Sequence, residues 1–258
     1  MNGWADQLLL LGVGTARIAV AFALIPIFST DTIPAMVRNS ILVSLGLISL
    51  VLQPPLDTSM IGPAGWVAIF AKEVFVGLII GFFFGSVLWA LEAAGQIIDT
   101  KIGATLAQIV DPLSGHQTSL NGALLGRLAG VVFIVSGGLS LLVQVVMESY
   151  ALWPIAATMP RLDPRGLALF EGEFGRLMLL ATIFAAPVLT VLFLIDLTLG
   201  LMNRFAQQLN VFTLSMSIKS YGATAIILLL LGSYIEAIVR DIQSRPAIIV
   251  SILKGLGG

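Results

Sequence analysis

Long apolar runs separated by short polar breaks make up most of this chain. A helix that crosses a membrane needs about 20 mostly apolar residues. Six runs approach or exceed that length: residues 8–28, 37–52, 66–91, 122–147, 177–201 and 221–238. Two weaker candidates are the more polar segment 93–110 and a short apolar tail at 247–253. The pattern predicts an all-α membrane protein with about six to eight hydrophobic helices.

Prolines mark most of the breaks between these runs. Proline fixes φ and lacks the backbone N–H, so it gathers where helices stop. The longest polar connection, residues 153–176, contains three prolines. Pro26 and Pro187 lie inside apolar runs, where we expect kinks.

Composition supports the membrane assignment. The chain of 258 residues is 58% hydrophobic and 10% charged, whereas soluble domains carry about 25% charged residues. The whole chain, residues 1–258, is most simply one integral-membrane domain, and its first run lacks the basic flank of a cleaved signal. A formal net charge of -1 gives no electrostatic basis for binding nucleic acid.

The inventory of reactive side chains argues against an enzyme. There is no cysteine, and His116 is the single histidine, which excludes a His-Glu-x-x-His metal site. A Ser/His/Asp site would have to use His116, and no nucleophile-elbow pattern accompanies it. We expect no catalytic residue, no metal and no cofactor, and interpret His116 as a solvated loop histidine.

Several polar residues interrupt the apolar runs. Glu92, Gln96 and Asp99 are spaced at i, i+4 and i+7, on one helical face. Such a face suits a subunit contact or an ion-linked gate, and the alternative is a wet helix face at the membrane boundary.

Isolated charges lie deeper in the runs. Arg17, Arg127 and Asp196 each need a partner, either in this chain or in another subunit. Asp196 and Arg204 are eight residues apart and become neighbours if one helix continues through both. Lys72 and Glu73 open a long apolar run, where we expect them to reach toward water along its edge.

A polar island at residues 203–219 separates two long apolar runs. Polar groups at the edge of hydrocarbon usually face a bundle interior, an aqueous cavity or another subunit. The island's candidates for subunit contact are Asn203, Arg204, Gln208, Asn210, Phe212 and Lys219.

Two sets of glycines recur every fourth residue and form flat helix faces. Such faces let a second helix approach closely, either from the same chain or from another subunit. The candidates for helix packing are Gly77, Gly81, Gly85, Gly122, Gly126 and Gly130.

An ordered set of short motifs resembles a known family. In chain order it comprises EAAGQIID from Glu92, GAT from Gly103, DPLSG from Asp111, SY and WP near residue 150, AAP from Ala185, LGLMNRFA from Leu199, QLNVF from Gln208 and IKS from Ile218. The chain resembles the T-subunit family of the type III secretion export apparatus, which is related to the flagellar FliR family. The similarity covers residues 17–238, and DPLSG and LNVF…IKS favour the injectisome branch. Gln207 and Ser217 stand where the family pattern has prolines.

The resemblance implies a core subunit of an export gate in the bacterial inner membrane. It implies helical hairpins that wind, together with R-like and S-like subunits, round a pore for unfolded exported proteins. A U-like switch protein, a V-like export ring and membrane lipid are further implied partners, with energy supplied by other components.

The resemblance also implies a plug. Residues 109–121 match the family's segment that closes the pore, and an ordinary surface loop is the alternative. Non-helical backbone at membrane depth survives only where protein covers it or water fills a cavity. The plug residues are Ile109, Val110, Asp111, Pro112, Leu113, Ser114, Gly115, His116 and Gln117.

A small-solute secondary transporter is the competing function. Broken helices with buried acids near the bilayer midplane are typical of that class. The chain shows no inverted repeat, which argues against it.

Overall fold

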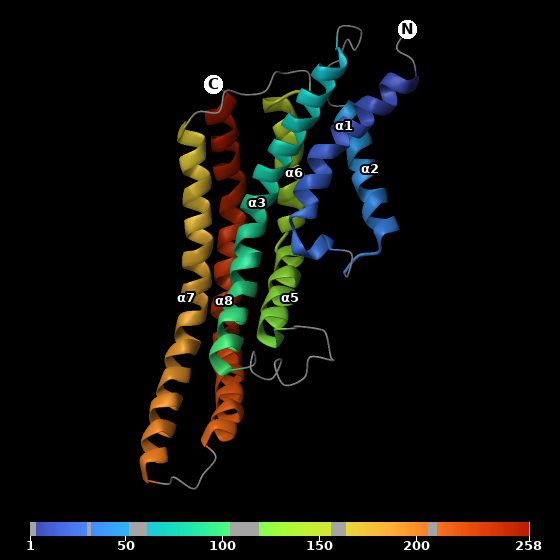
Figure 1. The fold of residues 1–258 in the computed structure, drawn as a ribbon. Coiled ribbons are helices and arrows are strands. Elements are labelled where there is room, and N and C mark those ends of the chain that lie inside the picture. Colours follow the sequence, from blue (N-terminus) through green and yellow to red (C-terminus); the bar gives the residue numbers. More distant parts are fainter. Residues whose placement is uncertain are drawn as a thin grey trace. The chain divides into compact units, whose positions relative to one another are not determined.

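Helices account for all the regular structure in the described part of the chain. The computed structural model describes residues 4–29, 32–51, 61–103, 119–155, 164–205 and 211–257. Figure 1 shows the elements in order: α1 (Trp4–Ala23), η1 (Pro26–Phe28), α2 (Ala35–Val51), α3 (Pro63–Ile102), α5 (Leu120–Val135), α6 (Gly138–Leu152), α7 (Pro164–Phe205) and α8 (Val211–Gly257). The predicted all-α membrane fold is confirmed.

Helix α3 is longer than either run predicted for it. The run 66–91 and the second run as far as Ile102 form one helix of 40 residues, Pro63–Ile102, because the Leu-Glu-Ala-Ala sequence at 91–94 has high helix propensity. The helix ends where Gly103 turns to φ +97 and donates its N–H to the carbonyls of Asp99 and Thr100. Glycine is the residue that adopts this left-handed conformation without a steric penalty.

The run 122–147 is broken instead of continuous. Helices α5 and α6 meet at a bend of 68°, and Gly137 at the break has φ +81. No proline marks this position, so the sequence pattern alone predicts one helix where the chain forms two.

The prolines differ in where they lie relative to the helices. Pro26 follows the end of α1 and begins the short helix η1. Pro187 and Pro246 both lie inside continuous helices, so the tail at 247–253 is the end of α8 and not a separate segment. Helix α7 starts at Pro164, the first helical position, where the missing N–H costs nothing. The connection predicted at 153–176 is therefore largely helical from residue 164 onward.

The chain divides into two compact units. Unit 1 comprises Met1–Ser86, Phe133–Phe174 and Asp241–Gly258, and unit 2 comprises Val87–Val132 and Gly175–Arg240. The long helices α3, α7 and α8 supply residues to both units. This division describes packing, and the single-domain assignment of residues 1–258 stays a prediction.

Each unit has its own apolar core. In unit 1, α1 packs along α2 (Figure 1), and the Phe22 and Phe28 rings meet edge to face with centroids 4.7 Å apart. In unit 2, buried Ala90, Leu177 and Ala181 pack with neighbouring apolar residues of α3 and α7. Tyr234 of α8 donates its hydroxyl to the Phe184 carbonyl at 2.7 Å.

The apolar helices differ in how much of their surface the chain covers. Three described helices are long and apolar enough to cross a membrane, or four if the bent α5–α6 pair is one span. In the most apolar window of α3, 72% is buried, compared with 28% for α7 and 22% for α8. Large exposed apolar side chains on α7 and α8 include Leu179, Ile183, Phe193, Leu194, Leu228 and Leu229. Monomeric soluble proteins rarely expose apolar surface on this scale, so the chain is an integral membrane protein.

Candidate functional site

The deepest charges of unit 1 gather around Arg17 of α1. Its Nε and Nη2 atoms donate to the two carboxylate oxygens of Glu73 in α3 at 2.8 and 2.9 Å. Both side chains are 0% exposed. A bidentate arginine–carboxylate pair is the strongest form of charge-assisted hydrogen bond.

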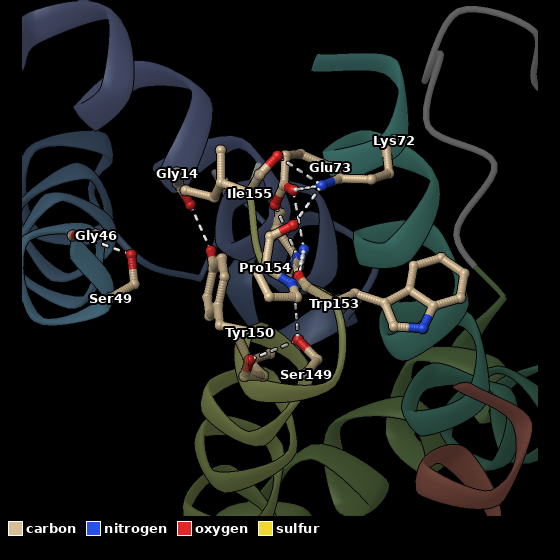
Figure 2. Close-up of polar contacts among 12 residues, drawn as sticks. Gly14, Gly46, Ser49, Lys72, Glu73, Ser149, Tyr150, Trp153, Pro154 and Ile155 are labelled. Atoms are coloured by element: carbon tan, nitrogen blue, oxygen red, sulfur yellow. Dashed lines mark hydrogen bonds and ion pairs between the residues drawn. The ribbon is translucent and has the colours of Figure 1, made fainter. Parts of the chain in front are cut away.

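The rest of the guanidinium is also satisfied. Arg17 Nη1 donates to Ser149 Oγ, and Nη2 also donates to the Trp153 carbonyl, both at 2.9 Å. The Arg17 Cζ atom lies 4.1 Å from the centroid of the Tyr150 ring, a cation–π distance. The Tyr150 hydroxyl donates to the Gly14 carbonyl (Figure 2). Arg17 therefore joins α1, α3 and α6.

Lys72 extends this cluster along α3. Figure 2 shows Lys72 and Glu73 beside Pro154 and Ile155, and Lys72 Nζ donates to both of those carbonyls, at 2.7 and 2.8 Å. Lys72 Nζ also lies 3.2 Å from a Glu73 oxygen, and its side chain is 1% exposed. The expectation that these residues reach toward water is wrong, because the carbonyls that follow the end of α6 need donors.

A second buried cluster in unit 1 joins α3, α7 and α8. Glu173 Oε1 accepts from Arg245 Nη1 and from Ser86 Oγ, both at 2.7 Å. Arg245 also donates to the two carboxylate oxygens of Asp241, at 3.0 and 2.8 Å. Two carboxylates thus bind one buried arginine, and Ser86 binds one of these carboxylates, so loss of Arg245 would remove a cation from a buried acid.

The charged group of unit 2 is more open to solvent. Asp196 of α7 lies between Lys101 of α3 and Lys219 of α8, with N–O distances of 3.3 and 3.1 Å. Lys219 also donates to the Lys101 carbonyl at 3.3 Å. The Asp196 and Lys101 side chains are 32% and 43% exposed. Helix α7 does continue from Asp196 to Arg204, but the Asp196 carboxylate pairs with the two lysines.

Asp99 joins the end of α3 to the start of α5. Its carboxylate accepts from Ser119 Oγ at 2.5 Å and from the backbone and side-chain nitrogens of Asn121 at 2.9 and 2.5 Å. Ser119 Oγ in turn accepts from the Gly122 N–H at 3.0 Å, which is an N-cap bond. Gly95 lies against the Asn121 backbone, where any larger residue would collide. A carboxylate beside a helix N-terminus also interacts favourably with the positive end of the helix dipole.

The two acids and one amide predicted on one face of α3 have different surroundings. Asp99 is buried and bonded as above, Glu92 is half-buried, and Gln96 is exposed. A methyl group on Gly126 would lie 3.4 Å from Glu92 Cβ, so α5 packs on this face. The face is therefore covered in part by the chain itself.

Four glycines of the predicted faces meet side chains or backbone of this chain: Gly77, Gly81, Gly122 and Gly126. A methyl group on Gly77 would lie 2.5 Å from the Arg17 carbonyl oxygen, and one on Gly81 would lie 2.7 Å from that of Ala21. Gly122 lies against Gln96 in the same way, with 3.0 Å to its Cγ. Gly85 and Gly130 are buried. Close approach within the chain accounts for these contacts.

The remaining predicted residues divide between the described part and the rest. Asn203 and Arg204 are exposed at the end of α7, and Lys219 is bound to Asp196. Phe212 lies in α8, but its side chain is outside the described part. The plug residues Ile109–Gln117, together with Gln208 and Asn210, also lie outside the described residues.

Arg127 differs from the other arginines inside apolar runs. It is exposed on α5, and among the described residues it has no hydrogen bond or ion pair. Arg17 and Arg245 are both paired with carboxylates in the same chain. Of the two arginines predicted to need a partner, only Arg17 finds one among the described residues.

Sequence reasoning missed the partners in both buried clusters. Arg17 and Glu73 are 56 positions apart, and Glu173 and Arg245 are 72 apart. Lone charges in apolar runs signal that a partner is needed, but only the fold identifies it. Among the described residues no group of three or more acids, histidines or cysteines is arranged to hold a metal.

Comparison with known proteins identifies the family. A family model described as bacterial export proteins, family 1, matches residues 8–244. The chain is 34% identical to Yop proteins translocation protein T of Yersinia pestis, across 83% of this chain and 82% of that protein. It is 33% identical to the secretion system apparatus protein SsaT of Salmonella typhimurium, across 85% of each chain. Identity to the flagellar biosynthetic protein FliR of Bacillus subtilis is 29%, across 88% of each chain. The predicted resemblance is confirmed, and the chain belongs to the bacterial export proteins of family 1.

Proposed function

We propose that this chain is a core subunit of the inner-membrane export gate of a bacterial type III secretion system. The match of residues 8–244 to the export-protein family carries the proposal. Higher identity to the translocation and secretion-apparatus proteins than to FliR supports the injectisome branch.

The exposed apolar helices support a subunit that works in an assembly. Helices α7 and α8 leave most of their apolar windows uncovered, whereas α3 is mainly buried. R-like and S-like subunits, with lipid around them, would cover such surface. The U-like switch protein and the V-like ring complete the proposed set of partners.

The chain contributes to transport by shape and not by catalysis. Its role is to line, seal and open a pore through which unfolded proteins pass. The buried clusters around Arg17 and Glu173 hold α1, α3, α6, α7 and α8 at fixed positions within unit 1. Fixed helices of this kind suit a wall that keeps its form while a substrate passes.

Closure of the pore is assigned to residues 109–121. Asp99 near the end of α3 binds Ser119 and Asn121 at the start of α5. One carboxylate therefore connects the two helices that precede and follow residues 104–118. The island residues Asn203, Arg204, Gln208, Asn210, Phe212 and Lys219 are assigned to subunit contacts. Deleting residues 113–117 should make the assembled gate leaky to small ions, and an unchanged conductance of the assembled complex would contradict the plug.

Assembly is the direct test of the proposed function. The tagged chain is co-expressed with the membrane proteins encoded beside it, purified in detergent, and weighed by native mass spectrometry. A hetero-oligomer with several copies of two small helical proteins is expected. A stable monomer or homo-oligomer, with those proteins present but unbound, would contradict the proposal and favour a small-solute transporter.

A further inference from the structure

One face of α5 combines exposed apolar side chains with a single exposed charge. Leu120, Leu124, Arg127 and Val131 are spaced at i, i+4, i+7 and i+11, which places them on one helical face. Leu120, Leu124 and Val131 are 78%, 52% and 60% exposed, and Arg127 is exposed between them. We call these four residues the Arg127 stripe.

The opposite face of α5 is packed against other residues of unit 2. Leu125 and Ala129 are 0% exposed, and Gly122 and Gly126 let the helix approach Gln96 and Glu92 of α3. Packing this close fixes the rotation of α5 about its axis. The Arg127 stripe therefore cannot turn inward to find a carboxylate on α3.

Lipid tails do not suit this stripe. Leu120, Leu124 and Val131 fit hydrocarbon, but a guanidinium among them is costly there unless it is paired or hydrated. Arg127 is about 10 Å along the axis from Leu120 at 1.5 Å per residue, so two helical turns separate it from the start of α5.

The chain's other deep arginines indicate what Arg127 requires. Arg17 and Arg245 each bind a carboxylate with bonds of 2.7 to 2.9 Å in an apolar setting. Arg127 is exposed among apolar side chains of its own face, and it has no such partner among the described residues. No acid in the described part of the chain pairs with Arg127, so charge complementarity favours an acid of another chain.

We propose that the Arg127 stripe docks an apolar helix of another export-apparatus subunit, and that an Asp or Glu within that helix's apolar face pairs with Arg127. The proposal rests on the proposed function, because it takes the partner from the same assembly. It adds which helix of this chain forms the contact and which chemistry the partner must present.

Site-specific photocrosslinking tests the docking surface. A photoreactive phenylalanine analogue replaces Leu124 or Val131 in the full chain, expressed with the neighbouring membrane proteins. We expect Leu124 and Val131 to crosslink to one helix of one partner subunit, and that helix to contain an acid in the crosslinked stretch.

Charge exchange then tests the pairing. Arg127→Asp should lower the yield of assembled complex about tenfold or more, since it places like charges together. Changing the partner's acid to Arg in the same cells should restore most of the yield. Arg127→Lys keeps the charge and should retain more assembly than Arg127→Ala.

The outcomes separate this inference from the proposed function. If the wild-type chain assembles but Leu124 and Val131 yield only lipid adducts, the stripe faces lipid and the docking inference is overturned. The inference is also overturned if Leu124 and Val131 crosslink to a subunit but Arg127→Asp leaves the yield of assembled complex unchanged. If the wild-type chain does not assemble at all, the proposed function itself fails.

Discussion

The Arg17 cluster of unit 1 and the Asp196 group of unit 2 use the same kinds of charge in different surroundings. Arg17 and Glu73 are 0% exposed, and each of the three guanidinium nitrogens donates to an acceptor. Asp196 is 32% exposed between two lysines, one of them 43% exposed. Water can replace a lost partner in the second group but not in the first.

This difference determines what each group contributes. A buried pair loses hydration on both sides, so removing one member leaves an uncompensated charge that costs about 3–5 kcal/mol. A pair near the surface is screened and contributes about 0–1 kcal/mol. The Arg17 cluster therefore specifies how α1, α3 and α6 meet, whereas the Asp196 group adjusts the contact among α3, α7 and α8.

Glu73→Gln should have the largest effect, because Glu73 neutralises both Arg17 and Lys72. Unfolding free energy should fall by about 3–5 kcal/mol, seen as a large drop in the thermal midpoint of the detergent-purified protein. Glu92→Gln is the matched control on the same helix, since Glu92 has no ion pair among the described residues. Similar losses for the two variants would contradict the role assigned to Glu73.

Arg245→Met should rank second. It leaves Glu173 and Asp241 without this cation, although Ser86 still donates to Glu173. We expect a loss of about 2–4 kcal/mol, near the range for a broken buried pair. Arg240→Met, five residues earlier on α8, removes only an exposed pair with Glu236. A thermal midpoint for Arg245→Met no lower than that for Arg240→Met would show that burial does not decide the effect.

Asp99→Ala lies between the two extremes. It removes the acceptor for Ser119 and Asn121, and unsatisfied polar groups cost about 1–3 kcal/mol. Backbone amides in the first turn of α5, residues 120–123, should exchange hydrogen faster. Ser119→Ala removes the N-cap and should cost about 1 kcal/mol. Unchanged exchange in that turn for both variants would contradict the joining role of Asp99.

The sequence predicted the helices better than the contacts between them. Six apolar runs became helices because hydropathy and helix length are local properties, readable at each position. The sequence did not predict the break at Gly137 because glycine is also common inside membrane helices. Only the φ of +81 at Gly137 reveals the bend. The sequence did not predict Glu73 and Glu173 as the partners of Arg17 and Arg245, because they lie 56 and 72 residues away along the chain. The need for a partner was predictable from the cost of a lone charge, but its identity depends on the packing.

Asp196→Asn should have the smallest effect and the clearest dependence on salt. Two lysines lose their shared carboxylate, but Lys101 is 43% exposed and is hydrated in its absence. We expect a loss of less than about 1 kcal/mol at low ionic strength. At about 1 M salt the Debye length falls to about 3 Å, so the difference from wild type should nearly vanish. Glu73→Gln should keep its full effect under the same conditions, since solvent ions do not reach a pair that is 0% exposed. If both variants lose their effect at high salt, the Arg17 cluster is accessible to water, and the contrast between the two units disappears.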